Sequence, residues 1–403
     1  MSVRSLAYAA AMPISPPLHD PHFWAGDPYP AFAELRASDP VHRYDGEAGA
    51  LWLITRHADV LAISKDPATF CSGKGVLLTD LTRTALSTDS IIYLDPPQHA
   101  KHRKLVSPSL SVRRVAELED RVRSIVVELL DAVDPNEVID AVEALSIPLP
   151  LMVIAELVGV PRWDLGDFRK WSDAMITAAS EATPESIELG AELFVYIDAV
   201  VRERQAEAQD DLVSLLAHGS VDGEALTEAD INMFVLTLLV AGNETTRSLI
   251  SNSLDVLARN PDERQRMADD RSIIPTAVEE LLRWEPPIMS FCRTATRETE
   301  VSGTPIAEGD YLLLAYQSAN RDEAVFGPTA DRLDVTRNPN PHTSFGYAEH
   351  YCMGAGLARL EARVFFEELL ARWPRWELAG PIERLPSRLA RGVVHLPIVL
   401  DPR

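Results

Sequence analysis

The segment Phe345-Gly-Tyr-Ala-Glu-His-Tyr-Cys352-Met-Gly354, followed by Ala-Gly-Leu-Ala-Arg-Leu-Glu361, holds one cysteine between an aromatic-glycine turn and a predicted helix start. Backbone amides at the start of a helix stabilise a thiolate, and such donors also tune a metal bound to the sulfur. A lone thiolate is one of the few axial ligands that proteins give to haem iron. Cys352 is therefore a candidate iron ligand. The alternative is a small buried hydrophobic residue, the commonest fate of a free cysteine.

The composition of the 403-residue chain is that of a globular enzyme, with 46% hydrophobic and 25% charged residues. No linker or repeat divides it, so we expect an extended leader over residues 1–26 and a single domain over residues 27–403. Three cysteines far apart in the chain imply no disulfide framework and fit a reducing cytoplasm. The longest apolar run, Ile231 to Asn243, is too short for a membrane span and predicts a buried helix.

The balance of charge is strongly acidic, with 38 Lys and Arg against 61 Asp and Glu and a formal net charge of −23. Such a chain is poorly suited to nucleic acid or to an anionic membrane as a partner. One basic segment, from Lys101 to Arg114, contains no acidic residue. It is either a solvated helix face or a docking patch for a small acidic protein, and composition alone does not choose.

Helical periodicity dominates the chain, with apolar residues three and four positions apart between charged ones. Strand patterns are short and few. The predicted fold class is mainly α with small β-sheets, neither a helix bundle nor a βαβ array. We expect helices over Pro30–Arg36, His57–Ser64, Arg113–Val133, Leu149–Leu157, Ser186–Gln209, Thr227–Ala258, Pro275–Trp284 and Gly354–Trp373, and strands over Ala50–Thr55, Glu300–Val301, Tyr311–Ala315 and Val393–Leu400.

The predicted helix from Thr227 has a capping-box-like start and an apolar first half, so it should cross the core. The polar sequence 243–246 then arrives in mid-helix and predicts a local irregularity, because glycine and β-branched residues there are poor helix formers. A carboxyl group beside a hydroxyl group, Glu244 and Thr245, could relay a proton to bound dioxygen. The alternative is that Thr245 and Thr246 bond back to carbonyl oxygens and bend the helix.

Two further features involve charged residues. Glu280 and Arg283 lie three residues apart on one predicted helix face, and as a surface pair they would contribute only a few tenths of a kcal/mol. Cationic residues also recur in polar loop contexts, where they would suit the two carboxylates of a haem, although each alone would be a surface residue by default. These are His99, Arg103, Arg293 and His350.

Together the motifs resemble those of the cytochrome P-450 superfamily, the haem-thiolate monooxygenases, of the soluble bacterial class. The resemblance runs from about Asp27 to the C-terminus. Its motifs are Ala241-Gly-Asn-Glu-Thr-Thr246, Glu280-x-x-Arg283 and Phe345-x-x-x-x-His350-x-Cys352-x-Gly354, in the order and spacing of the family.

The resemblance implies a cytochrome P-450 fold and a haem b whose iron is bound by the thiolate of Cys352. It makes Glu244 and Thr245 the proton-delivery pair. It places His99, Arg103, Arg293 and His350 on the haem propionates, and Phe345 at the cofactor. It also implies a structural charge triad made by Glu280, Arg283 and Arg332.

One residue departs from the family's pattern. The cysteine loop usually carries a second glycine where this chain has Ala348. Alanine resists a positive φ, so the turn must adopt a tolerated backbone or accept some strain. We expect an effect on redox tuning or haem packing and not a loss of iron ligation.

The basic segment gains a meaning from the resemblance, because this part of the family's fold lies near the cysteine side of the haem, where an electron donor docks. Arg103 would turn inward to the haem. An acidic ferredoxin would then meet the other cations, and its association would be sensitive to salt. The candidate contacts are Lys101, Lys104, Arg113 and Arg114.

The expected substrate is a hydrophobic small molecule (steroid, terpenoid or lipid-like), because the candidate pocket residues are almost all apolar. They are Phe234, Leu238, Ala241, Ile288, Met289, Phe291, Val393 and Val394, with contributions from residues 76–92 and 165–192. Two other classes of function stay open: a haem-thiolate peroxygenase or isomerase, which the presence of both Glu244 and Thr245 disfavours, and a non-catalytic haem sensor.

Overall fold

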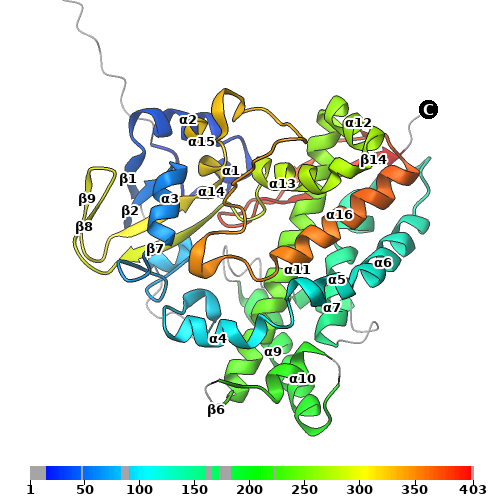
Figure 1. Cartoon of the computed structure of the whole chain (residues 1–403), viewed down its shortest axis with the longest axis horizontal. Coiled ribbons are helices and arrows are strands. Elements are labelled where there is room, and N and C mark those ends of the chain that lie inside the picture. The colour runs from blue at the N-terminus through cyan, green and yellow to red at the C-terminus, as the bar shows by residue number, and fades with distance from the viewer. Residues whose placement is uncertain are drawn as a thin grey trace, which may run out of the picture.

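The computed structural model describes residues 15–46, 49–82, 90–159, 166–171, 174, 183–209, 211–221 and 224–400. Helices make up most of it, and the strands of its largest sheet lie at one side, as Figure 1 shows. The mainly α prediction is therefore confirmed. The main helices are α2 (Tyr29–Ser38), α3 (His57–Ser64), α4 (Gln98–Val106), α5 (Val112–Glu117), α6 (Glu119–Asp131), α7 (Pro148–Val158), α9 (Pro184–Ala206), α10 (Leu212–Ala217), α11 (Glu228–Arg259), α12 (Pro261–Asp269), α13 (Ile274–Trp284) and α16 (Ala355–Arg372).

The largest sheet has five strands in the order β1-β2-β10-β7-β3. Its central strand β10 reads Tyr-Leu-Leu-Leu-Ala and is buried along its whole length, as expected of an apolar run covered on both faces. Strand β10 runs parallel to β2 and antiparallel to β7, which places Arg293 of β7 opposite Leu312. The five strands are β1 (Val41–Gly46), β2 (Gly49–Ile54), β3 (Phe70–Cys71), β7 (Ser290–Ala295) and β10 (Tyr311–Ala315).

Smaller sheets close the C-terminal part of the fold. Strand β14 (Pro397–Leu400) pairs with β11 (Trp376–Leu378) on one side and with β4 (Val138–Asp140) on the other. The predicted strand Val393–Leu400 is divided at Leu396, because its first part, β13 (Val393–His395), pairs with β12 (Glu383–Arg384) instead.

Helix α11 crosses the molecule and links two hydrophobic clusters. Its first half contributes Ile231 and Leu239 to a cluster with α7, α9 and α10, which we call the α9 cluster. Its second half contributes Leu249 and Leu254 to a cluster with α6, α13 and α16, which we call the α16 cluster. The acid–hydroxyl sequence thus lies where the two clusters meet.

The backbone of α11 is helical without a break from Glu228 to Arg259, so the predicted irregularity is wrong. The predicted capping box is confirmed, since Thr227 and Asp230 each bond the backbone amide of the other. Gly242 has a packing role: a Cβ there would lie 3.0 Å from Cδ1 of Ile154, so glycine lets α7 approach closely. In the described ranges, no helix has both the length and the apolar character needed to cross a bilayer.

The chain before residue 27 differs from the expected extended leader where it is described. Residues 21–25 form the short helix α1 (Pro21–Ala25), and Leu18 and Trp24 are fully buried. The indole Nε1 of Trp24 donates to the carbonyl of Leu18 at 2.7 Å. The described part of this segment is therefore not extended, because burial of a tryptophan outweighs the chain-extending effect of the nearby prolines.

The predicted helix Arg113–Val133 is two helices, α5 and α6, which meet at Leu118.

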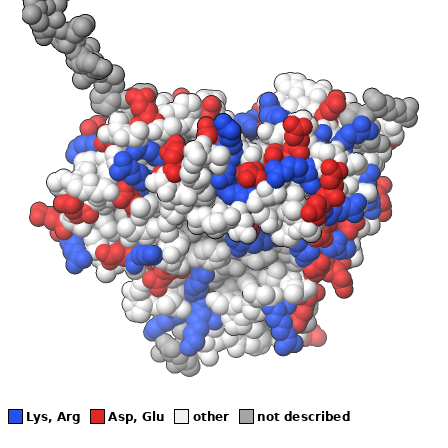
Figure 2. Space-filling view, turned by 45° about the horizontal axis from the view of Figure 1, so that its top comes forward, with Lys and Arg blue, Asp and Glu red and all other residues white. Residues whose placement is uncertain are grey.

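Figure 2 shows basic and acidic side chains interspersed over the face in view. The net charge of −23 is therefore not gathered into one acidic area on that face.

Candidate functional site

Cys352 lies in a tight loop between residue 345 and helix α16. Its amide donates to the carbonyl of Phe345 at 2.8 Å, which closes the loop. The thiol is surrounded by protein, and this burial raises its pKa, while the amides of Gly354 and Ala355 hydrogen bond the sulfur and lower the pKa. The residue is nonetheless accessible to solvent, because it lines a cavity of about 630 Å³. The helix start presents the sulfur as the sequence predicts.

In the turn before the cysteine, two residues adopt a left-handed backbone: Gly346 at φ 69° and Ala348 at φ 54°. Glycine accepts this conformation freely, whereas an L-residue with a Cβ is disfavoured there by about 1 to 2 kcal/mol. Of the two outcomes expected for Ala348, the structure therefore shows the strained one.

Two arginines and two histidines, from α4, β7 and the cysteine loop itself, converge at one place. The rings of His99 (α4) and His350 lie 4.3 Å apart between centroids. Burial, and then the neighbouring charge of Arg103, lower the pKa of His99 to about 4, with Arg293 adding to the effect. The positive charge at this place is therefore carried by the two arginines, while burial and these charges keep His99 and His350 neutral.

The same cluster tests whether the residues fit a haem. Nδ1 of His99 is buried without a hydrogen-bond partner, and the nearby Oε1 of Glu349 lies 3.9 Å away, beyond bonding distance. Buried polar atoms without a partner are rare, and arginine and histidine donors suit carboxylates. The donor set of His99, Arg103, Arg293 and His350 therefore fits two propionates next to a thiolate, and the residues fit the cofactor.

Glu244 and Thr245 occupy successive positions on α11. The Thr245 hydroxyl donates to the carbonyl of Ala241 at 2.7 Å, so the back-bonding alternative is observed, although it does not interrupt the helix. Glu244 is buried, and its carboxylate accepts from Ser248 Oγ at 3.2 Å and meets Arg247 Nη1 at 3.4 Å. A hydroxyl that donates to a carbonyl can still accept a hydrogen bond, so Thr245 keeps a capacity for relay.

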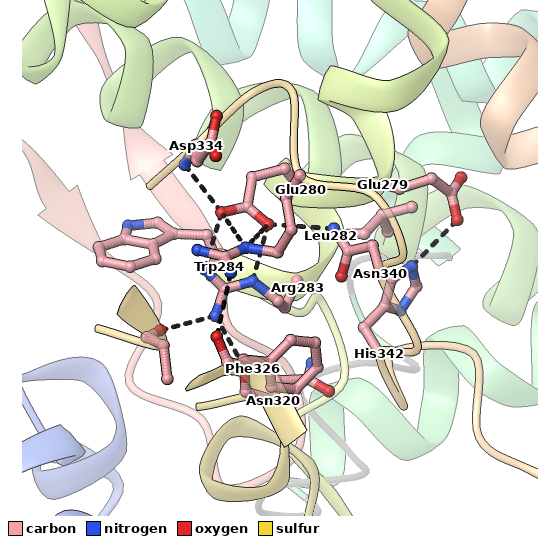
Figure 3. A network of polar contacts seen from close by, with 12 residues as sticks. Glu279, Glu280, Leu282, Arg283, Trp284, Asn320, Phe326, Asp334, Asn340 and His342 are labelled. Carbon is pink, nitrogen blue, oxygen red and sulfur yellow. Dashed lines mark hydrogen bonds and ion pairs between the residues drawn. The ribbon is translucent and has the colours of Figure 1, made fainter. Parts of the chain in front are cut away.

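Glu280 and Arg283 form a fully buried ion pair with two contacts of 2.7 Å (Figure 3). The third charged member is Arg337, whose Nε lies 3.1 Å from Glu280 Oε2. The prediction of Arg332 is wrong: its side chain is exposed, and only its carbonyl takes part, accepting from Arg283 at 3.0 Å. The chain turns after residue 332, and this turn brings Arg337, the next arginine in the sequence, back to the carboxylate of Glu280.

A second network, which the sequence did not suggest, joins this ion pair to the cysteine loop. Glu279, next to Glu280 on α13, binds Arg359 of α16 at 2.6 and 2.8 Å and His342 at 3.2 Å. Burial alone would raise the pKa of Glu279, but the hydrogen bonds from Arg359 and His342 lower it to about 2. The guanidinium of Arg359 also lies over the Phe345 ring at 4.4 Å. The sequence signal that could have predicted this network is the pair of adjacent glutamates at positions 279 and 280.

The comparison with known families decides the identity of this arrangement. The family model described as Cytochrome P-450 matches residues 151–380. The chain belongs to the cytochrome P-450 family. Members of this family bind haem through a cysteine thiolate, and this P-450 is a monooxygenase, an oxidoreductase that incorporates oxygen from O2.

Similar proteins cover almost the whole of this P-450. A vitamin D(3) 25-hydroxylase of Pseudonocardia autotrophica is 37% identical over 94% of this chain and 95% of its own. A linalool 8-monooxygenase of Pseudomonas putida is 33% identical over 96% of this chain and 99% of its own. The solved structure of a Mycobacterium marinum cytochrome P-450 in complex with pseudoionone has a TM-score of 0.87 at 32% identity, and it covers 99% of this chain and 100% of its own.

The candidate pocket residues of this P-450 fall into two groups. Phe234, Leu238 and Ala241 lie along α11, and Ile288, Phe291 and Val394 are partly buried. Phe234, Met289 and Val393 lie inside hydrophobic clusters, with 6%, 0% and 2% of their surface exposed. The structure does not place these three at an open pocket, because their side chains are taken up by core packing. Residues 83–89, 165, 172–173 and 175–182 of the expected pocket segments lie outside the described residues.

The basic segment spans α4 and α5, and all four candidate docking residues are exposed. Arg113 and Arg114 each pair with Glu117 at 3.1 Å, so an acid just beyond the segment offsets part of its charge. Between them and the cysteine lies the cavity of about 630 Å³, whose lining includes Val112, with 90% of its surface exposed. The face of the P-450 near Cys352 thus has a recess lined by apolar and charged residues, and the basic segment lies beside it.

Proposed function

We propose that this P-450 inserts one oxygen atom from O2 into a hydrophobic small molecule, with the Cys352 thiolate as the residue that would hold the iron of a haem b and an acidic ferredoxin as the electron donor. The observation that carries the proposal is the convergence of two arginines and two histidines beside a cysteine whose sulfur accepts hydrogen bonds from two backbone amides. Bound haem supplies the activation of dioxygen. The protein's part is to hold that group, supply protons and exclude water.

Two sets of groups would hold the haem: side chains at its propionates and backbone amides at the sulfur. His99, Arg103, Arg293 and His350 would bind the two propionates through charge-assisted hydrogen bonds. The amides of Gly354 and Ala355 draw electron density from the sulfur, which tunes an attached metal.

Proton delivery is proposed for α11. Glu244, buried and hydrogen bonded, would hold a proton at its carboxylate, and the Thr245 hydroxyl would pass it on at Oγ1. The presence of both groups on one helix turn favours oxygen activation over a peroxygenase or an isomerase.

A spectral experiment tests the iron ligand. The reduced carbon-monoxide adduct of the purified protein should show the red-shifted Soret band of thiolate ligation, and Cys352→Ser should abolish that band. Cys71→Ser is the matched control, because Cys71 is a free, buried cysteine in strand β3. A normal band in Cys352→Ser would refute the assignment.

The proposed substrate class is steroid, terpenoid or lipid-like. The support is the apolar character of the partly buried Leu238, Ile288 and Phe291, together with relatives named for vitamin D(3) and linalool. Apolar pockets hold ligands mainly by shape. A panel of such compounds should displace iron-bound water and give oxygenated products labelled from ¹⁸O2, whereas a preference for small polar acids would contradict the class.

For the electron donor, the exposed cations of the basic segment and the apolar residues of the neighbouring recess, such as Val112 and Leu110, together suit an acidic ferredoxin with an apolar contact at its centre. Because Glu117 already pairs with Arg113 and Arg114, reversal of Lys104 should slow electron transfer more than reversal of Arg113. Arg43→Glu is the control, since Arg43 is exposed on β1 of the five-stranded sheet. Unchanged rates in Lys104→Glu would remove the docking assignment.

The proposed compartment is a reducing cytoplasm, with which the free, buried Cys71 and Cys292 are compatible.

A further inference from the structure

The carboxylate of Glu244 is contacted by the next turn of its own helix. Ser248 Oγ donates to Oε1 at 3.2 Å, and Arg247 Nη1 lies 3.4 Å from Oε2. The side chain of Glu244 is 7% exposed and that of Arg247 is 13% exposed. Both carboxylate oxygens therefore have partners in a largely dry environment, where such contacts fix a flexible side chain.

The C-terminal segment packs directly on this contact. A Cβ at Gly392 would lie 2.8 Å from Ser248 Oγ, closer than real Cβ contacts, but 3.5 Å from Glu244 Oε1, an ordinary contact. Gly392 has no positive φ. The glycine is therefore required by the close approach to the Ser248 hydroxyl and not by its backbone conformation.

The segment around Gly392 is held in place by its neighbour. The carbonyl of Arg391 accepts from Asn252 Nδ2 at 2.8 Å, and the amide of Arg391 donates to the carbonyl of Pro287 at 2.8 Å. Its buried guanidinium pairs with Glu285. Glu244, Ser248 and Asn252 follow one another at four-residue spacing, so one face of α11 meets this fixed backbone.

We propose that Ser248 is a positioning residue for Glu244, and that Gly392 is a glycine so that the Ser248 hydroxyl can keep its place. The inference rests on the role of Glu244 in the proposed function and extends it. A carboxyl group that alternately holds and releases a proton needs a neighbour that can donate to the anion and accept from the acid. A serine hydroxyl does both, and an alanine does neither.

The test uses the holoenzyme with Ser248→Ala, Gly392→Ala and the double variant. Ser251→Ala is the matched control, because the Ser251 hydroxyl lies on the same helix and donates to the carbonyl of Arg247 at 2.9 Å. In Ser248→Ala we expect the yield of product per electron to fall about fivefold, which corresponds to one hydrogen bond of about 1 kcal/mol. The missing electrons should appear as hydrogen peroxide, the solvent isotope effect should change, and substrate KM should stay the same.

The glycine makes the test sharper. Gly392→Ala should reproduce the loss, because its new methyl group displaces the hydroxyl. The double variant should be no worse than Ser248→Ala, because without Oγ the added methyl group meets no close atom. Crystal structures supply a readout independent of activity: the Glu244 side chain should change rotamer in Ser248→Ala and in Gly392→Ala, and stay in place in Ser251→Ala.

The outcomes separate this inference from the proposed function. If Glu244→Gln couples like the wild type, the proton-delivery role itself fails. If Glu244→Gln is uncoupled while Ser248→Ala keeps wild-type coupling and the wild-type Glu244 rotamer, the positioning role is overturned and the proposed function stands. Additive losses in the double variant would overturn the link between Gly392 and Ser248.

Discussion

Nε of Arg337 lies 3.1 Å from Oε2 of Glu280, a carboxylate that Arg283 already binds through two nitrogens. The same carboxylate accepts from Asn340 Nδ2 at 3.0 Å and from the amide of Asp334 at 2.9 Å (Figure 3). A single buried acid thus fixes both a helix and the loop that leads to the cysteine. Removal of one partner from such a site leaves charge buried without compensation.

Arg337→Ala should therefore lower the free energy of unfolding by about 2 kcal/mol, since Glu280 loses one of several partners inside the protein. Arg332→Ala should change it by less than about 0.5 kcal/mol, because only the backbone of Arg332 takes part. Urea unfolding of the holoenzyme measures both. Equal effects of the two substitutions would contradict the assignment of Arg337.

Acid stability should depend on Glu279. Its pKa is lowered to about 2 from an ordinary value of 4.5, so the folded state prefers the charged form. The contribution to stability is complete above pH 4.5 and is lost as the pH falls toward 2, by at most about 3 kcal/mol. Unfolding measured from pH 6 to pH 2.5 should show a shallower decline in Glu279→Gln than in the wild type. Parallel declines would show that Glu279 has no such role.

Ala348→Gly should relieve the left-handed strain in the cysteine loop. The relief of about 1 to 2 kcal/mol is partly offset by the greater freedom of glycine in the unfolded chain, so stability should rise by up to about 1 kcal/mol. Ala191→Gly, at an exposed position inside α9, should instead lower stability by about 1 kcal/mol. Thermal unfolding distinguishes the two, and a loss of stability in Ala348→Gly would count against strain.

Haem retention should depend on Arg293. Loss of one charge-assisted hydrogen bond to a propionate costs about 1.5 to 3 kcal/mol, so Arg293→Ala should release haem about 10- to 100-fold faster. Arg297→Ala is the control, because Arg297 lies just beyond the same strand and donates to Thr69 Oγ1 at 2.7 Å. Transfer of haem to an acceptor apoprotein gives both rates. Equal rates would exclude Arg293 as a propionate ligand.

The sequence was sufficient where a motif is local. Glu280 and Arg283 are one helix turn apart, so a helix alone brings their charges together, and the residues from Phe345 to Gly354 form a loop closed within itself. The strand β10 and the helix α3 begin and end where their patterns predict. In these places short-range geometry decides the structure.

The sequence was insufficient where a partner lies far along the chain. Arg337 was missed because its approach to a residue 57 positions away depends on the path of the intervening loop. Glu117 was missed as the partner of Arg113 because the basic segment was delimited by composition and not by helix turns. The packing of Trp24 depends on a cluster with strands β2 and β10, which no local pattern reveals.

The division of α11 between two hydrophobic clusters has a mechanical consequence. Because α11 belongs to both clusters, a movement of the α9 cluster against the α16 cluster would bend or shift this helix between Leu239 and Leu249. Glu244 and Thr245 lie inside that interval. A ligand that spreads the two clusters would therefore move the proposed proton-delivery pair through the helix backbone, without touching either side chain.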